Sequence, residues 1–444
     1  MINEEKLRNL DKLSFEEICK LTGQDSDDFL NDAIPLNLNL TLINADSLIE
    51  DVIQLLKDNK VFKRTRNFNG HIKMLLANLF KANFLKDRFY IYYSRSPNRY
   101  KNIKRYNPND INYKPLMNVI EALVNMDLVE TSVGFYDKKT QTGKRSRIRM
   151  SFGFDELFDN HFITPSNLHK VSIDSIRLKD STKQLVDYEE TPLTRQIRKT
   201  VKEYNALLLD TNIAIPFKSD VVKDYLKENV VDFANNTYYR IFNNNSFEIG
   251  GRFYGPWWQS INSELRKLIT FNKKKTIELD YSSLHIHLLY SKEGIDYNEL
   301  YGKKADPYLL KGYGKRYRTI IKRAFLIALN MQTPKNFSQT VAYILREEGI
   351  FKKDISYKDI LSQFFASHPK IKKYFFTGVG TELQYIDSCI TESIVKRMCK
   401  LGIPVLGIHD SFIVEEKYKS ILEEYMYDSF IENKLVSIPS IAIK

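Results

Sequence analysis

Cysteine is scarce in this chain, with Cys19, Cys389 and Cys399 the only three among 444 residues. They are too far apart for a C-x-x-C site, and an odd number cannot pair completely into disulfide bonds. This pattern argues against a disulfide-stapled fold. It favours a reduced, cytoplasmic protein whose thiols serve as packing residues.

Long apolar runs are also missing. No run approaches the ~18 residues that cross a membrane, and the N-terminal MINEEKLRNLDK is too acidic and polar for a signal or transit peptide. We therefore expect no membrane contact. No repeat or low-complexity tract occurs, and a composition of 43% hydrophobic and 27% charged residues is typical of a globular protein. At 444 residues, two or three domains are expected.

The charge is uneven along the chain, whose net charge is +12. Residues 1–60 hold 13 acidic and 6 basic residues, a net charge of −7. Residues 61–150 hold 19 basic and 6 acidic residues, a net charge of +13. Such a concentrated positive field favours a polyanionic partner, most simply nucleic acid. A basic surface that only keeps the protein soluble is the alternative.

The patterns divide the chain into four regions: an acidic helical segment over 1–60, a basic domain over 61–165, a helical connector over 166–245 and a larger domain over 246–444. In the first region, SFEE at 14–17 has the form of a helix capping box, and LIEDVIQLLK has helical apolar spacing. The chemistry is expected in the fourth region.

The basic domain combines a helix with a hairpin. Strand-like RFYIYYS precedes an amphipathic helix, YKPLMNVIEALVNMDLV, and then two alternating strands, ETSVGFY and RSRIRMSF, flank the turn DKKTQTGK. A helix followed by a basic-tipped hairpin resembles a winged-helix module. Its expected phosphate contacts are Lys138, Lys139, Lys144, Arg145 and Arg147. A solvated hairpin tip, or a module used for protein contacts, is the alternative.

Two carboxylates stand where buried strands end. KKTIELDYSSLHIHLLY changes from strand to helical spacing after Tyr281, so Asp280 lies at the carboxyl end of a strand. In GIPVLGIHDSFIVEE, two apolar runs flank the pair His409-Asp410 at a hairpin tip. If the strands are neighbours in one sheet, both carboxylates can share divalent cations, as in-line phosphoryl transfer requires.

Between these carboxylates the chain predicts a cationic helix. In KRYRTIIKRAFLIALN, Arg318 and Lys322 are four residues apart and project from one face. Two cations so placed can hold a triphosphate. On spacing alone, an ordinary solvated face is the favoured interpretation.

In this order, the strand ending in Asp-Tyr-Ser, the Arg-x-x-x-Lys helix and the His-Asp hairpin resemble motifs A, B and C of family A, the DNA polymerase I-like nucleic-acid polymerases. The resemblance covers roughly residues 245–444. It implies an α+β, right-hand polymerase fold with palm, fingers and a reduced thumb, the connector being thumb-like and the winged-helix-like domain coming first.

The resemblance also implies residue roles. Asp280 and Asp410 would bind two Mg²⁺ ions, which Mn²⁺ can replace, and Lys322 would join them in catalysis. The implied nucleotide-binding residues are Arg318, Lys322, His285 and Tyr281. GGRFYGPWWQSINSELRKLI resembles the Gly-Arg stretch that precedes motif A in the family. The implied primer-template contacts outside the hairpin of the basic domain are Arg252, Gln259 and His409.

Four positions depart from the family. His285 stands where a glutamate usually excludes the ribose 2′-hydroxyl, and Leu326 and Asn330 replace an aromatic residue and a tyrosine of motif B. Ser411 follows the second aspartate, where DNA polymerases usually have Glu. The segment HDSF is similar to the segment that single-subunit phage-type RNA polymerases carry at this place. The preference between dNTP and rNTP is thus left open.

The leading hypothesis is a DNA-directed DNA polymerase or primase-polymerase. Nothing in the first 245 residues resembles a proofreading exonuclease, and a compact polymerase of this kind resembles replication proteins of plasmids and mobile elements. Its partners would be primer-template or single-stranded DNA, nucleoside triphosphates, and a helicase or small accessory replication protein. The alternatives are a compact single-subunit RNA polymerase or primase, and a non-catalytic DNA-binding replication initiator. A metal-dependent nuclease would need a denser carboxylate cluster.

Overall fold

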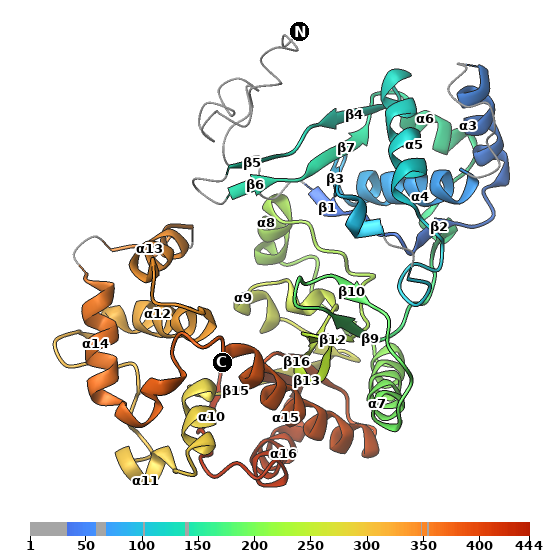
Figure 1. The fold of residues 1–444 in the computed structure, drawn as a ribbon. Coiled ribbons are helices and arrows are strands. Elements are labelled where there is room, and N and C mark those ends of the chain that lie inside the picture. Colours follow the sequence, from blue (N-terminus) through green and yellow to red (C-terminus); the bar gives the residue numbers. More distant parts are fainter. Residues whose placement is uncertain (1–32, 59–67, 101–102, 138–141, 348, 353–354) are drawn as a thin grey trace. The chain divides into compact units, whose positions relative to one another are not determined.

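The computed structural model describes residues 33–58, 68–100, 103–137, 142–347, 349–352 and 355–444. The capping box at 14–17 and the hairpin residues Lys138 and Lys139 lie outside these ranges. The chain forms two compact units (Figure 1). Unit 1 contains residues 1–174 and 220–232, and unit 2 contains residues 175–219 and 233–444.

Unit 1 is a mixed α/β unit. Its helices are α3 (Asp46–Asp58), α4 (Asn69–Leu85), η3 (Pro97–Tyr100), α5 (Tyr113–Asn125), α6 (Phe154–Asn160), η4 (Pro165–Asn167) and α8 (Asp220–Glu228). Its strands are β1 (Ala33–Pro35), β2 (Leu40–Leu42), β3 (Tyr90–Tyr93), β4 (Val129–Ser132), β5 (Phe135–Asp137), β6 (Thr142–Lys144), β7 (Ser146–Met150) and β8 (Leu168–Lys170). The main sheet has the order β1-β3-β7-β4.

The apolar face expected on the helix after the basic loop is present in α5. Leu116, Val119, Ile120 and Leu123 are all buried in the core of unit 1. The helix ends at Asn125, because the chain turns at Asp127 with φ of +55°. The two strands expected after it are each divided into two, so that β4 pairs with β7 while β5 pairs with β6.

Unit 2 contains the segments expected to carry chemistry. Its helices are α7 (Pro192–Leu209), η5 (Trp257–Gln259), α9 (Ser263–Arg266), α10 (Leu284–Lys292), α11 (Tyr297–Tyr301), η6 (Lys315–Tyr317), α12 (Arg318–Asn330), α13 (Phe337–Glu347), α14 (Tyr357–Ser367), η7 (Pro369–Tyr374), α15 (Gly380–Lys400), η8 (Glu416–Tyr418) and α16 (Lys419–Glu432). Figure 1 shows α12, α13 and α14 grouped together in orange.

The strands of unit 2 form two sheets. They are β9 (Ile176–Lys179), β10 (Leu185–Val186), β11 (Ile213–Ala214), β12 (Tyr239–Asn243), β13 (Ser246–Tyr254), β14 (Thr270–Phe271), β15 (Lys274–Tyr281), β16 (Val405–Ile408), β17 (Ser411–Glu415) and β18 (Ile441–Ile443). One sheet has the order β10-β9-β12-β13. The other has the order β11-β14-β15-β17-β16, and β18 also pairs with β15.

The connector expected over 166–245 is less helical than its sequence indicates. It contains α7 and α8, but β8, β9, β10, β11 and β12 also fall within it. These strands are two to five residues long, too short to show a clear alternation. β8 pairs with β2, β9 with β12 and β11 with β14, and these pairings between distant segments are not reported by local periodicity.

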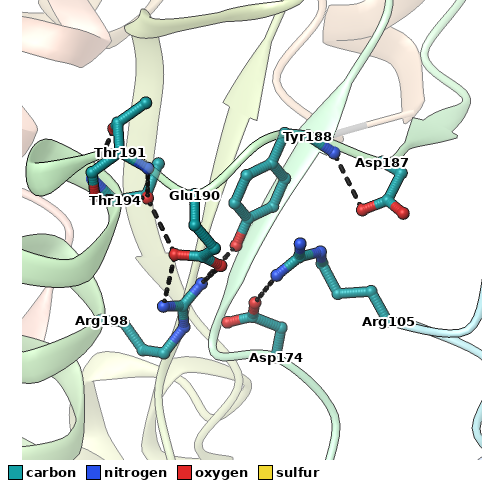
Figure 2. Close-up of polar contacts among 8 residues, drawn as sticks. All are labelled: Arg105, Asp174, Asp187, Tyr188, Glu190, Thr191, Thr194 and Arg198. Carbon is teal, nitrogen blue, oxygen red and sulfur yellow. Dashed lines mark hydrogen bonds and ion pairs between the residues drawn. The ribbon is translucent and has the colours of Figure 1, made fainter.

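Polar contacts define the start of α7 (Figure 2). The Thr191 hydroxyl accepts a hydrogen bond from the Thr194 backbone N–H, and the Thr194 hydroxyl accepts one from the Thr191 N–H, a reciprocal capping box. Arg198, one turn further, pairs with Glu190 and donates to the Tyr188 hydroxyl. The helix start is therefore tied to the chain before it.

Within unit 1, Arg105 pairs with Asp174 (Figure 2), and the guanidinium nitrogen lies 2.9 Å from the carboxylate oxygen.

Helix α15 is the central packing element of unit 2. It contacts β13, α16, α7, α10 and α12. Its side chains Leu383, Ile390, Ile394 and Met398 are fully buried. Because this helix is enclosed on several sides, any charged residue that it carries inward has to be paired.

Candidate active site

The strands that end at the two aspartates are neighbours, as the sequence predicts. β15 and β17 are antiparallel, with Asp280 directly opposite Ser411. The Tyr281 backbone N–H donates a hydrogen bond to the Asp410 carbonyl oxygen, with 3.3 Å between nitrogen and oxygen. The β16–β17 hairpin is also confirmed, with Ile408 opposite Ser411. Two buried strands thus hold Asp280 and Asp410 at one end of the sheet.

The two carboxylates interact electrostatically. Burial, together with the negative charge of Asp410, raises the pKa of Asp280 to about 6, while Lys444 and Lys322 oppose the shift. A cation beside Asp280 would favour its ionised form and offset the negative charge of Asp410. The pair is therefore suited to binding positive charge.

A lysine that the sequence did not single out contacts Asp280. The Lys444 ammonium nitrogen lies 3.0 Å from Asp280 Oδ1 and 3.8 Å from Glu278 Oε1. It directly follows the short strand β18, where Ala442 is opposite Asp280. A three-residue strand gives too weak a signal for sequence analysis to find it.

Glu278, two residues before Asp280, is a buried carboxylate with several partners. It pairs with Arg266, whose Nε lies 3.0 Å from Glu278 Oε2. The Ser411 hydroxyl donates a 2.6 Å hydrogen bond to Glu278 Oε1. The position after the second aspartate, at which this chain departs from DNA polymerases, is thus used to join β15 to β17.

Lys322 and His285 belong to the same electrostatic environment. The positive charge of Lys322 acts on both Asp280 and His285. Burial, together with the charges of Arg252 and Lys322, lowers the pKa of His285 to about 4, while Asp410 opposes the shift. His285 is therefore neutral at pH 7. Arg323, next to Lys322 in α12, is exposed.

Arg318 begins α12 as expected, but it is already paired. Its guanidinium forms an ion pair with Asp306, from the ADPYLL segment. It also lies over the Tyr308 ring at 5.5 Å from the centroid. The arginine is anchored at its inner end, and 40% of its side chain is exposed.

Arg252 is held by an aspartate that sequence analysis missed. Its Nε lies 2.7 Å from Asp387 Oδ2, and Asp387 is 1% exposed within α15. Burial raises the pKa of Asp387 to about 6, with Arg252 opposing and the charge of Asp410 adding to the shift. Asp387 lies on α15 and meets Arg252 of β13 only through tertiary packing, so no local sequence pattern indicates the pair.

The glycines before Arg252 bring β13 close to α15. Gly251 has φ of +78°, and a Cβ there would lie 2.7 Å from a Phe242 ring carbon and 2.8 Å from the Ser388 hydroxyl. No side chain fits without displacing these groups, and an L-residue is also strained at this φ. The glycine thus permits the close approach that sets Arg252 against Asp387.

Two expected site residues serve the interior instead. Tyr281, expected at the nucleotide, is 2% exposed, and its hydroxyl donates to the Met426 carbonyl in α16. Gln259, expected at the primer-template, donates to the carbonyls of Phe253 and Gly407 and accepts from the Gly255 N–H. Strand alternation directs Tyr281 to the face opposite Asp280. The Gln259 amide ties the β16–β17 hairpin to β13.

His409 occupies the tip of the hairpin as predicted. Its φ of +59° is in the left-handed region, the side chain is exposed, and its ring lies 5.8 Å from the Tyr254 ring. Asp410 beside it is half-buried. The tip therefore presents an imidazole to solvent next to the carboxylate pair.

In unit 1, the expected phosphate contacts separate into two kinds. Arg145 is exposed and stacks on Tyr92, with its guanidinium carbon 5.1 Å from the ring centroid, and Lys144 is half-buried. Arg147, in contrast, is 6% exposed in β7, and burial lowers its pKa to about 10. Arg147 is therefore buried in the sheet and does not lie on the hairpin surface as expected.

The described residues contain no group of three or more His, Cys, Asp or Glu side chains arranged to hold a metal ion. Mg²⁺ commonly uses only one or two carboxylates and takes its other ligands from water and substrate phosphates. The position of Asp280 and Asp410 at neighbouring strand ends, with the charge of Asp410 acting on Asp280, is the observation that fits such an ion. The two residues would be its protein ligands.

Comparisons with known proteins add little to this geometry. No family model matches the chain, and no curated protein matches it. Among solved structures, it is similar to the POL domain of Pol1 from M. smegmatis in complex with DNA primer-template and dNTP, at 11% identity and a TM-score of 0.28. The match covers 91% of this chain and 66% of that one. A likeness this low gives no residue of this chain a role.

Within the ranges that the structure describes, no helix is both long and apolar enough to span a bilayer.

Proposed function

We propose that this protein is a template-directed nucleotidyltransferase, a DNA-directed DNA polymerase that acts in replication of a mobile element or plasmid. The observation that carries the proposal is the pairing of β15 with β17, which sets Asp280 and Asp410 at neighbouring strand ends. Lys322 exerts its positive charge on Asp280 and His285, and Arg252 exerts its positive charge on His285. This set matches the chemistry of phosphoryl transfer more closely than that of a binding module.

In the proposed reaction, the primer 3′-oxygen forms a bond to the α-phosphorus of a nucleoside triphosphate as the bond from that phosphorus to the β-phosphate oxygen breaks. Pyrophosphate leaves, and the hydroxyl proton passes to solvent. Bound Mg²⁺ would supply activation of the hydroxyl and stabilisation of the phosphate charge. Asp280 and Asp410 would hold the ions, and the Lys322 ammonium would neutralise charge on the triphosphate. Arg318, anchored on Asp306, would add a second cation from the same helix.

Other residues would act on the primer and the sugar. Arg252, held by Asp387, would present its remaining N–H groups to the primer-template. His409 at the hairpin tip would lie beside the growing end. His285 is uncharged at pH 7 and would select the sugar through the size of its ring rather than through its charge. In this proposal the winged-helix-like unit binds DNA, and a right-hand arrangement of palm and fingers is the expected architecture of unit 2.

The test is a primer-extension assay with Mg²⁺. Asp280→Asn and Asp410→Asn keep side-chain size but remove a charge, and each is expected to reduce extension by about 100-fold or more. Asp428→Asn is the matched control and should extend primers like the wild type. It removes the charge of a partly exposed carboxylate on α16, which pairs with Arg397 of α15. Full extension by Asp280→Asn or Asp410→Asn would contradict the assignment.

The same assay separates the related functions. A primed template and an unprimed single strand are each offered with dNTPs or with rNTPs. Synthesis from rNTPs alone would identify an RNA polymerase or primase, and synthesis on the unprimed strand a priming enzyme. Absence of synthesis under every condition, with DNA binding retained, would favour a replication initiator.

A further inference from the structure

A third cation lies at the carboxylate pair besides Lys322 and Arg252. We propose that Lys444 is a built-in counter-ion of Asp280: it neutralises this carboxylate when no divalent ion is bound and competes with a divalent ion for it. The proposal rests on the metal site of the proposed function. It adds a residue that the family resemblance does not supply.

The backbone of β18 determines where Lys444 points. Ala442 lies opposite Asp280 in the antiparallel pair, and the Lys444 backbone N–H donates to the Glu278 carbonyl at 3.1 Å. Side chains directly opposite each other project from the same face of a sheet. Lys444 therefore shares a face with Glu278 and Asp280, and its ammonium reaches both carboxylates.

The distances bring the ammonium and a bound ion into competition. Lys444 Nζ is 3.0 Å from Asp280 Oδ1. A Mg²⁺ ion on that oxygen would be about 2.1 Å from it, so the two positive charges could be no more than about 5 Å apart. Their repulsion acts at a site where the Asp280 side chain is only 21% exposed and solvent screening is reduced.

Lys444 also has a second carboxylate available. Glu278 Oε1 lies 3.8 Å from Lys444 Nζ, and 37% of the lysine side chain is exposed. A rotation of the lysine can move the ammonium from Asp280 toward Glu278 without breaking the β18 backbone pairing. Arrival of an ion would therefore transfer Lys444 to Glu278, whose present cation partner is Arg266.

The experiment measures Mn²⁺ binding to the full chain without DNA or nucleotide, by electron paramagnetic resonance of free Mn²⁺. Lys444→Met is expected to bind Mn²⁺ at least about threefold more tightly than the wild type, because one competing charge is removed. Lys444→Arg keeps the charge and should bind like the wild type. Lys417→Met, which removes an exposed lysine paired with Glu415, is the matched control and should also bind like the wild type.

A second measurement does not depend on affinity. Without metal, Lys444→Met should melt at a lower temperature than the wild type, because Asp280 and Asp410 then repel each other without a counter-ion. Added Mn²⁺ should raise its Tm more than it raises that of the wild type. Equal or weaker Mn²⁺ binding by Lys444→Met, with an unchanged Tm response, would overturn the proposal.

Asp280→Asn separates this proposal from the one on which it rests. If Asp280→Asn binds Mn²⁺ like the wild type, the ion is not at Asp280 and the proposed metal site fails. If Asp280→Asn loses Mn²⁺ binding while Lys444→Met binds like the wild type, the metal site stands and only the role of Lys444 fails.

Discussion

The Ser411 hydroxyl donates a 2.6 Å hydrogen bond to the carboxylate of Glu278, between residues 133 positions apart in the chain. Ser411 is 0% exposed and Glu278 is 5% exposed. The bond links the strand that ends at Asp280 to the strand that begins after Asp410. The relative position of the two aspartates thus depends on a buried polar contact as well as on the backbone ladder.

Ser411→Ala is expected to lower the free energy of unfolding by about 1–2 kcal/mol, because a hydrogen bond to a buried charged group is lost. Primer extension should fall by more than the stability loss explains, because β15 and β17 lose a fixed register at the aspartates. Urea unfolding and extension rates measure the two effects. Ser260→Ala is the control, since that hydroxyl donates to the Trp257 carbonyl, away from the two aspartates' strands. Unchanged extension would show that the backbone ladder alone positions the aspartates.

Asp387→Asn is expected to weaken the hold on Arg252 while leaving the reacting groups in place. Asp387 would then be a positioning residue, so the KM for primer-template should rise about tenfold or less while kcat changes little. Steady-state kinetics with a varied primer-template concentration measure this. Arg252→Lys should give the same pattern, because lysine lacks the planar fork of donors. A fall in kcat at constant KM would instead place Asp387 at the chemical step.

His285→Glu tests sugar selection. A carboxylate at this position, near Asp280 and Asp410, is expected to increase the preference for dNTP over rNTP by excluding the 2′-hydroxyl. The measurement is the ratio of kcat/KM for one dNTP and the matching rNTP on the same primed template. His285→Gln, which changes size without adding charge, is the control. An unchanged ratio in His285→Glu removes this residue from sugar selection.

Acid is expected to destabilise unit 2 through a buried histidine. His287 is 5% exposed and bonds to Ser437, and burial lowers its pKa from 6.5 to about 4. Because its pKa is lower in the folded state, the unfolded chain binds more protons between these values. The stabilisation is complete above pH 6.5 and is lost as the pH falls toward 4, by up to about 3 kcal/mol.

Chemical unfolding at pH 7.0 and pH 5.0 measures this loss. His287→Gln should show a smaller difference between the two pH values than the wild type does. The exposed His169, changed to Gln, is the control and should keep the wild-type difference. An equal pH dependence in His287→Gln and the wild type would contradict the assignment of the lost stability to this ring.

DNA binding by unit 1 is expected to depend on salt. Replacing Lys144 and Arg145 by Ala should weaken binding similarly for different sequences and reduce the slope of log K against log salt by about 2. Titrations between low and moderate salt measure the slope. The control, Lys223→Ala with Lys227→Ala, removes two exposed lysines of α8 that are already paired with aspartates. An unchanged slope for the first variant would place the phosphate contacts elsewhere.

Local patterns in the sequence predicted most of the elements that form the candidate site. The strand ending at Asp280, the helix carrying Lys322 and the hairpin around Asp410 all appear where the apolar spacing indicates. The family resemblance placed Tyr281 and Gln259 at the site. In the structure, the Tyr281 hydroxyl donates to the Met426 carbonyl and the Gln259 amide donates to the Gly407 carbonyl. A motif letter gives a position in the chain, but only packing decides which way its side chain faces.

The sequence by itself therefore determined the alternation and helical spacing of the motifs, because these depend on neighbouring residues and on the burial of one face. The tertiary structure decided the partners: Asp387 for Arg252, Glu278 for Ser411 and Lys444 for Asp280. These contacts join residues that are more than a hundred positions apart. Their charges meet only after strands from distant segments pair, and no periodicity in the sequence reports that pairing.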